Sequence, residues 1–144
     1  MNLLEYYNKE TKTLSFPLNY NKELKNLPED VENIIFSENY EDSEFSKFNC
    51  KVDNLPNNLQ SITFGYDFNQ PIDKLPKNLQ SITFGPEFNQ PIDKLPTTVD
   101  ELAFWSHSNI KNNIPEFISN IKIIFYYDDI HNQQIDNLPC HIKK

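Results

Sequence analysis

The side chains best suited to metal binding or catalysis lie near the C-terminus. His131, Cys140 and His141 stand close in sequence to Asp128 and Asp129, and imidazole, thiolate and carboxylate groups are the usual ligands of zinc. Their spacing matches no zinc-binding pattern, however, and His131 takes a position that carries a packing phenylalanine elsewhere in the chain. We therefore predict structural roles for these residues and no metal site.

A nucleophile with a neighbouring base is the second chemical arrangement to consider. Ser106, His107 and Ser108 follow Asp100 within one short stretch, and serine, histidine and aspartate can form a hydrolase triad. Adjacent residues of a strand point to opposite faces of a sheet, so these side chains do not converge on one site. The chain also has only two glycines, too few for a glycine-rich phosphate-binding loop. We predict no catalytic residue, no cofactor and no enzymatic activity.

Composition narrows the classes of partner. The 144 residues include 13 basic and 21 acidic side chains and carry a net charge of −8, which argues against binding to nucleic acid. No apolar run is long enough to cross a bilayer, and no signal peptide opens the chain. No asparagine stands in an Asn-x-Ser/Thr acceptor sequence. We therefore expect a cytoplasmic protein with no membrane partner.

The elements that position any functional residue come from an internal repeat. Residues 55–74 and 75–94 differ at only three positions. A period of about twenty residues predicts a solenoid, in which each coil of the chain packs on its neighbours. Within a coil, the alternation Ile-x-Phe predicts a short strand, Leu-Pro a corner before it and Asn-Gln-Pro the opposite corner. Diverged copies of the same pattern extend the repeat in both directions.

These copies predict a mainly β solenoid of about five to six coils of roughly 20 residues, with a parallel sheet on one face and little helix. We assign residues 1–144 to a single repeat domain. Within it, residues 1–13 form an N-terminal cap, residues 14–137 the repeats and residues 138–144 a C-terminal half-coil cap. An acidic insertion, Glu38–Phe45, interrupts one coil. It is typical of a solvated loop, and a recognition loop is the alternative.

One asparagine recurs at the same place in the coils. Its side chain can hydrogen-bond the backbone of the adjacent coil and so form a ladder along the solenoid. The predicted ladder consists of Asn21, Asn49, Asn69, Asn89, Asn109 and Asn132.

The two cysteines are too far apart to form a disulfide. Cys50 and Cys140 fall about four coils apart, roughly 20 Å along the axis, which predicts two free thiols.

The string Phe-Asn-Gln-Pro-Ile, which follows Ile-Thr-Phe-Gly in residues 55–94, resembles the FNIP repeat. This repeat is related to leucine-rich repeats and is known chiefly from social amoebae and from giant DNA viruses of amoebae. The resemblance implies a right-handed, leucine-rich-repeat-like solenoid that serves as a binding module. Family members often carry an N-terminal F-box, but only residues 1–13 precede the first repeat here. Ligase-adaptor function is therefore not carried over.

A partner would meet the side chains that point outward from the strands. Most of them are small and polar, and they become larger and more varied toward the C-terminus. Trp105 has two interpretations, because an exposed tryptophan is typical of binding hot spots and a buried one would fill an irregular coil. The candidate binding residues on the strand face are Thr63, Thr83, Glu101, Ala103, Trp105, Lys122, Ile124 and Tyr126.

The sequence favours a non-catalytic protein–protein interaction module that binds a cellular protein, or a host protein in the host cytoplasm if the chain is viral. Two alternatives remain. The chain can be a structural or self-associating repeat protein, because a sheet edge left open at the end of a solenoid invites pairing. It can also be a substrate receptor that works with a ubiquitin-ligase component on another chain, by analogy with the family. We expect a monomer or an end-to-end homodimer.

Overall fold

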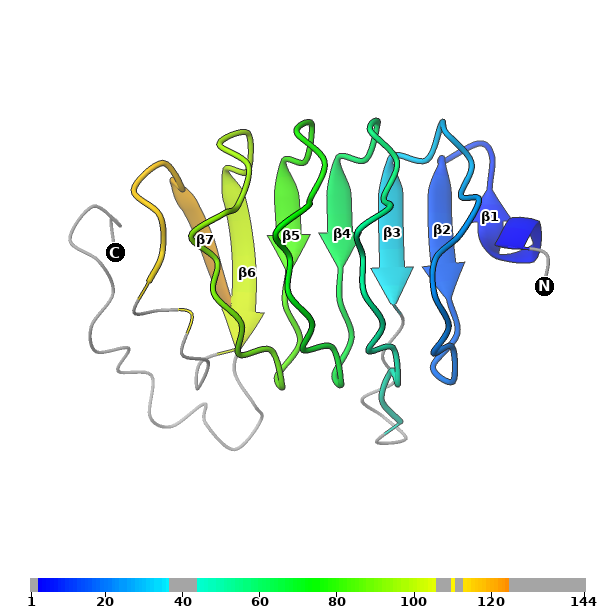
Figure 1. Ribbon diagram of the computed structural model, residues 1–144, viewed down its shortest axis with the longest axis horizontal. Coiled ribbons are helices and arrows are strands. Elements are labelled where there is room, and N and C mark those ends of the chain that lie inside the picture. The colour runs from blue at the N-terminus through cyan, green and yellow to red at the C-terminus, as the bar shows by residue number, and fades with distance from the viewer. Residues whose placement is uncertain (1–2, 37–43, 106–109, 111–112, 125–144) are drawn as a thin grey trace.

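The chain forms a β-solenoid in which successive coils each add one strand to a single sheet (Figure 1). The computed structural model describes residues 3–36, 44–105, 110 and 113–124. The helical residues among them are all of the 3-10 type, and none is in an α-helix. The elements are η1 (Leu3–Tyr6), β1 (Tyr7–Asn8), β2 (Thr13–Phe16), β3 (Asn33–Phe36), β4 (Ser61–Thr63), β5 (Ser81–Thr83), β6 (Glu101–Trp105) and β7 (Asn120–Ile124).

The strands lie in the sheet in their order along the chain, from β1 to β7. β1 pairs with β2 in the antiparallel sense, and every later pair is parallel. Equivalent repeat positions face each other, as Ile62 does with Ile34 on one side and Ile82 on the other. The predicted mainly β, parallel solenoid with coils of about twenty residues is confirmed.

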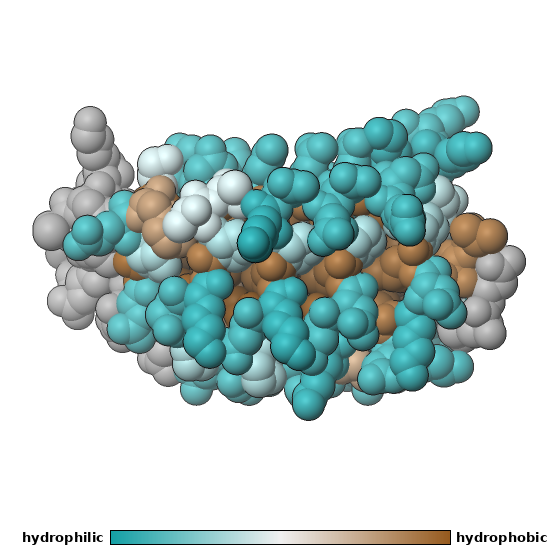
Figure 2. All heavy atoms as spheres, turned by 45° about the horizontal axis from the view of Figure 1, so that its top comes forward, coloured by the Kyte–Doolittle hydropathy of each residue, from teal (hydrophilic) through white to brown (hydrophobic). Residues whose placement is uncertain are grey.

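Turns at two corners close each coil. The backbone N–H of Leu59 donates to the carbonyl of Pro56 at 3.1 Å, and the other Leu-Pro corners repeat this bond, as predicted. The opposite corner begins earlier than the Asn-Gln-Pro signal indicates. There, the N–H of Phe68 donates to the carbonyl of Gly65 at 3.4 Å. Figure 2 shows the Leu-Pro side of the solenoid as an apolar stripe along the long axis, bordered by hydrophilic side chains.

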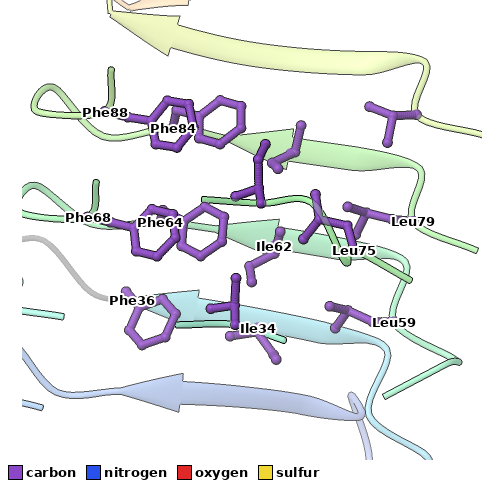
Figure 3. Close-up of a cluster of buried hydrophobic side chains, with 14 of the residues drawn as sticks. Ile34, Phe36, Leu59, Ile62, Phe64, Phe68, Leu75, Leu79, Phe84 and Phe88 are labelled. Atoms are coloured by element: carbon purple, nitrogen blue, oxygen red, sulfur yellow. The ribbon is translucent and has the colours of Figure 1, made fainter. Parts of the chain in front are cut away.

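Two columns of stacked aromatic rings form the centre of the core. Within one coil the ring centroids of Phe64 and Phe68 lie 3.7 Å apart, and both rings stack on their equivalents in the next coil at about 6 Å. Figure 3 shows these rings on one side of the core and aliphatic side chains such as Leu79 on the other. At the N-terminal end, Tyr6 contacts Phe16 at 5.6 Å and so covers the end of the columns.

The asparagine hydrogen bonds are present through the regular coils. The backbone N–H groups of Asn49, Asn69 and Asn89 each donate to the side-chain oxygen of the ladder asparagine one coil earlier, all at 3.0 Å. A second donor, which the sequence did not suggest, reaches the same oxygen. Gln70 and Gln90 donate from Nε2 at 3.0 Å. Asn109 and Asn132, and the half-coil at residues 138–144, lie outside the described residues.

The corner after β5 brings two backbones unusually close. A Cβ atom added at Gly85 would lie 2.1 Å from the carbonyl oxygen of Gly65 in the preceding coil. Gly85 does not have a positive φ, so the reason for glycine here is space and not backbone conformation. Trp105 occupies the corresponding repeat position one coil later. At this position β6 continues as a strand through Trp105, which pairs with Ile124.

Candidate functional site

The outward side chains of β2 to β7 form two rows on one face of the sheet, because every second residue of a strand points to the same side. We call them the first and second outward rows. The strand register places the row members side by side, as the sequence frame predicts. The first row is Thr13, Asn33, Ser61, Ser81, Glu101 and Asn120, and the second is Ser15, Ile35, Thr63, Thr83, Ala103 and Lys122.

The N-terminal part of this face is polar and nearly uncharged. The hydroxyl of Ser61 lies 2.6 Å from the Oδ1 atom of Asn33, so hydrogen bonds also run along the first row. The exception is Ile35, a large apolar side chain that is 40% exposed and lies between Ser15 and Thr63 in the second row. An exposed isoleucine between hydroxyl-bearing neighbours gives a partner one apolar contact point.

A shallow hollow interrupts the face over β5, β6 and β7. It has a volume of about 490 Å³. Ala103 lies between Thr83 and Lys122 in the second row, and its short side chain leaves the space. Glu101 and Lys122, which are both exposed, stand at its rim. The hollow is thus the place on this face where hydroxyl, amide, carboxylate and ammonium groups meet.

The predicted binding residues differ in exposure and position. Thr63, Thr83 and Ala103 are half-buried on the outward face, whereas Glu101 and Lys122 are exposed there. Ile124 is half-buried at the end of β7. Tyr126 lies outside the described residues.

Trp105 requires a correction. Its side chain is only 5% exposed, so the packing interpretation holds and Trp105 is not an accessible member of the strand face. Strict alternation along β6 would place Trp105 on the outward side with Glu101 and Ala103, so its burial at the end of the strand breaks the alternating pattern. The equivalent positions in the twin repeats, Gly65 and Gly85, are buried as well.

A second hollow, which the sequence analysis missed, lies near the ends of β2 and β3. It has a volume of about 620 Å³ and is lined by Pro17, Leu18, Glu44, Phe45 and neighbouring residues. Phe45, the last residue of the predicted insertion, packs on Tyr66 with 4.5 Å between ring centroids. Residues 37–43 of the insertion lie outside the described residues, so its solvated or recognition role stays a prediction.

The thiol of Cys50 acts as a hydrogen-bond donor and not as a nucleophile. Its sulfur lies 3.3 Å from the Oδ1 atom of Asn21, the position that a glutamine donor takes in the regular coils. Burial, and then the negative charge of Glu23, raises the pKa of the Cys50 thiol, which keeps it protonated near neutral pH. Cys50 is a free cysteine, and Cys140 lies outside the described residues.

The candidate metal and catalytic residues of the sequence analysis fall mostly outside the described part of the chain. His107, His131 and His141 are all in this group. Within the part that is described, no group of three or more histidine, cysteine, aspartate or glutamate side chains can hold a metal ion. No helical segment there has the length and apolar character that crossing a bilayer requires.

Stacked coils of about twenty residues, one strand per coil and an asparagine ladder define a leucine-rich-repeat-like β-solenoid. The family model described as FNIP Repeat matches residues 48–75 and 72–107. The chain is an FNIP-repeat protein, as its Phe-Asn-Gln-Pro-Ile strings indicated.

A solved structure shares this architecture. The crystal structure of a circular leucine-rich-repeat protein from the giant virus CroV is 32% identical, with a TM-score of 0.54. The match covers 81% of this chain and 17% of the viral protein, so the present chain spans about a sixth of that protein. No curated protein matches the sequence significantly.

Proposed function

We propose that this FNIP-repeat solenoid is a non-catalytic protein-interaction module whose outward strand face binds a partner protein in the cytoplasm. Solenoids of this class typically serve as scaffolds for protein interaction. The observation that carries the proposal is the parallel register of β2 to β7, which presents two accessible rows of side chains along one face. The binding residues proposed are Thr63, Thr83, Glu101, Ala103, Lys122 and Ile124.

The composition of this face supports reversible association. Small hydroxyl side chains lose little rotamer entropy when covered, and they can exchange water for partner hydrogen bonds. Ile35 adds an apolar contact, with 40% of its surface exposed. No catalytic geometry accompanies these groups among the residues described, and the thiol of Cys50 is engaged with Asn21.

Self-association is the less favoured reading. The N-terminal end of the sheet is occupied by the antiparallel β1, and Tyr6 covers the aromatic columns there. We infer that residues 1–13 act as a cap, which disfavours stacking of a second copy on this end. A role as receptor for a ubiquitin-ligase component has no observation in its favour beyond family analogy.

Affinity capture from amoeba lysate, read by mass spectrometry, tests the proposal. The disruptive variant is Thr63→Lys with Thr83→Lys, which places two charges on the outward face. The matched control is Asn57→Lys with Thr97→Lys, which adds the same charge at exposed corner positions. Circular dichroism first establishes that both variants fold.

A prey protein retained by the wild type and the control but lost by the face variant would support the strand face as the binding surface. A prey lost equally by both variants would reject this surface. The absence of any specific prey, together with concentration-dependent mass by light scattering, would replace the interaction module with self-association.

A further inference from the structure

Two charged side chains interrupt the otherwise uncharged outward rows. Ten of the twelve residues in these rows are uncharged, and the two exceptions are Glu101 on β6 and Lys122 on β7. Both stand at the rim of the hollow of about 490 Å³ above Ala103. Opposite charges and open space therefore coincide at one place on the face.

The chain leaves these two charges available. Elsewhere on the solenoid, several lysines pair with acidic side chains of a neighbouring coil, as Lys74 does with Asp53 at 3.2 Å. In the part of the chain that the structure describes, neither Glu101 nor Lys122 forms an ion pair. Because both side chains are exposed, their charged ends can meet a partner without breaking an internal contact.

The register fixes how the two charges are spaced. Lys122 lies directly beside Ala103, and Glu101 precedes Ala103 by two residues on the same strand. Strands about 4.8 Å apart and residues that advance about 3.3 Å each put the two Cα atoms roughly 8 Å apart on a diagonal. In an extended peptide, side chains two residues apart are separated by about 6.6 Å and point to the same side. The two spacings match within the reach of long side chains.

We propose that the hollow above Ala103 binds an extended segment of the partner that presents one basic and one acidic side chain, two residues apart. The basic side chain pairs with Glu101 and the acidic one with Lys122. Ser81, Thr83 and Asn120, which also line the hollow, hydrogen-bond the backbone of the segment. This inference rests on the proposed function, because it specifies the chemistry of the partner at the same face.

The test titrates the full, ¹⁵N-labelled chain with three capped peptides that differ only in charge. They contain Lys-Ser-Glu, Lys-Ser-Lys and Glu-Ser-Glu, each between glycines. We expect the mixed-charge peptide to shift amide resonances of β5 to β7 and to bind the wild type more tightly than either like-charged peptide. The expected difference is about threefold for each mismatched charge, and it decreases with added salt.

Charge-reversed variants give the sharper readout. We expect Glu101→Lys to change the preference to Glu-Ser-Glu and Lys122→Glu to change it to Lys-Ser-Lys. Glu87→Lys and Lys77→Glu are the matched controls, because they make the same charge changes at exposed positions outside the outward rows. Both controls should keep the wild-type preference.

The outcomes separate this inference from the proposed function. A preference that the Glu101 and Lys122 variants leave unchanged, or that the controls change equally, would overturn the inference. Shifts confined to β2, β3 and β4 would also overturn it, while the outward face remains a binding surface. No shift on the outward face with any peptide, combined with no prey in the capture experiment, would reject both.

Discussion

Replacing Gly85 by alanine is the sharpest test of how the coils stack. The added Cβ would meet the carbonyl oxygen of Gly65 at 2.1 Å, the carbonyl carbon at 2.6 Å and the backbone nitrogen of Tyr66 at 3.1 Å. All three atoms belong to the backbone of the preceding coil, so no side-chain rotation relieves the clash. The two coils must separate locally by about 1 Å to restore an ordinary carbon–oxygen contact.

The size of the expected loss in stability follows from the hydrogen bonds that join these two coils. Phe64 N–H donates to the carbonyl of Thr83 at 2.9 Å, and the N–H of Asn89 donates to Asn69 Oδ1 at 3.0 Å. A displacement of about 1 Å stretches the donor–acceptor distance beyond that of a hydrogen bond, and each lost bond lowers the stability by about 1 kcal/mol. With the disturbed packing of the aromatic columns added, we expect a loss of about 3–4 kcal/mol in the free energy of unfolding.

Urea and thermal unfolding measure this loss, which corresponds to a decrease of roughly 6–16 °C in Tm for a chain of this size. Glu87→Ala, at an exposed position of the same corner, serves as the control and should change the stability by less than about 0.5 kcal/mol. Without a close contact at Gly85, the substitution would increase the stability. Because Gly85 has no positive φ, alanine in open space would stabilise the fold by about 0.4–1 kcal/mol. Unchanged or increased stability would therefore refute the close stacking.

Three further changes test other parts of the fold. Asn69→Ala removes an oxygen that accepts two hydrogen bonds and should lower the free energy of unfolding in urea by about 1–3 kcal/mol. Gln70→Ala removes one donor and should lower it by about 0.5–1.5 kcal/mol. The raised pKa of the Cys50 thiol means that the folded chain holds this proton more tightly than the unfolded chain. The stabilisation from this proton is complete below the ordinary thiol pKa and is lost as the pH rises through the folded value. Cys50→Gln should therefore lose less stability than the wild type as the pH rises above about 8. A wild-type loss equal to that of the variant would contradict this role. Tyr6→Ala should destabilise the fold by about 1–2 kcal/mol and speed hydrogen exchange in β2. The exposed control Leu4→Ala should leave hydrogen exchange in β2 unchanged. Equal exchange rates in the two variants would reject the cap.

Much of the fold was readable from the repeat because a solenoid is nearly one-dimensional. Each coil contacts its neighbours, so a period of about twenty residues sets which residues face each other across the sheet. Ile62 beside Ile82 and Thr63 beside Thr83 follow directly from the sequence alignment of the two copies. The asparagine ladder follows for the same reason, because one polar residue at a fixed place in every coil meets its own equivalent.

The side-chain arrangement at the diverged coils was not readable in this way. The twin repeats carry glycine at the position of Trp105, so they give no example of a side chain there, and its burial at the end of β6 became clear only in the structure. The second donor at the ladder oxygens was also missed, because the reach of Gln70 to Asn49 depends on the distance between coils and not on spacing within one.

The sequence by itself determined the period, the direction of the strands and the division of each coil into inward and outward residues, because these depend on local alternation and on identical neighbours. Only the tertiary structure decided where the outward face is open. The hollow above Ala103 exists because side chains from β5, β6 and β7 differ in size and do not fill the same space. The contact of Gly85 with Gly65 likewise appears only when two coils lie at their stacked distance. Volume and clearance depend on three strands at once, and a one-dimensional pattern does not encode them.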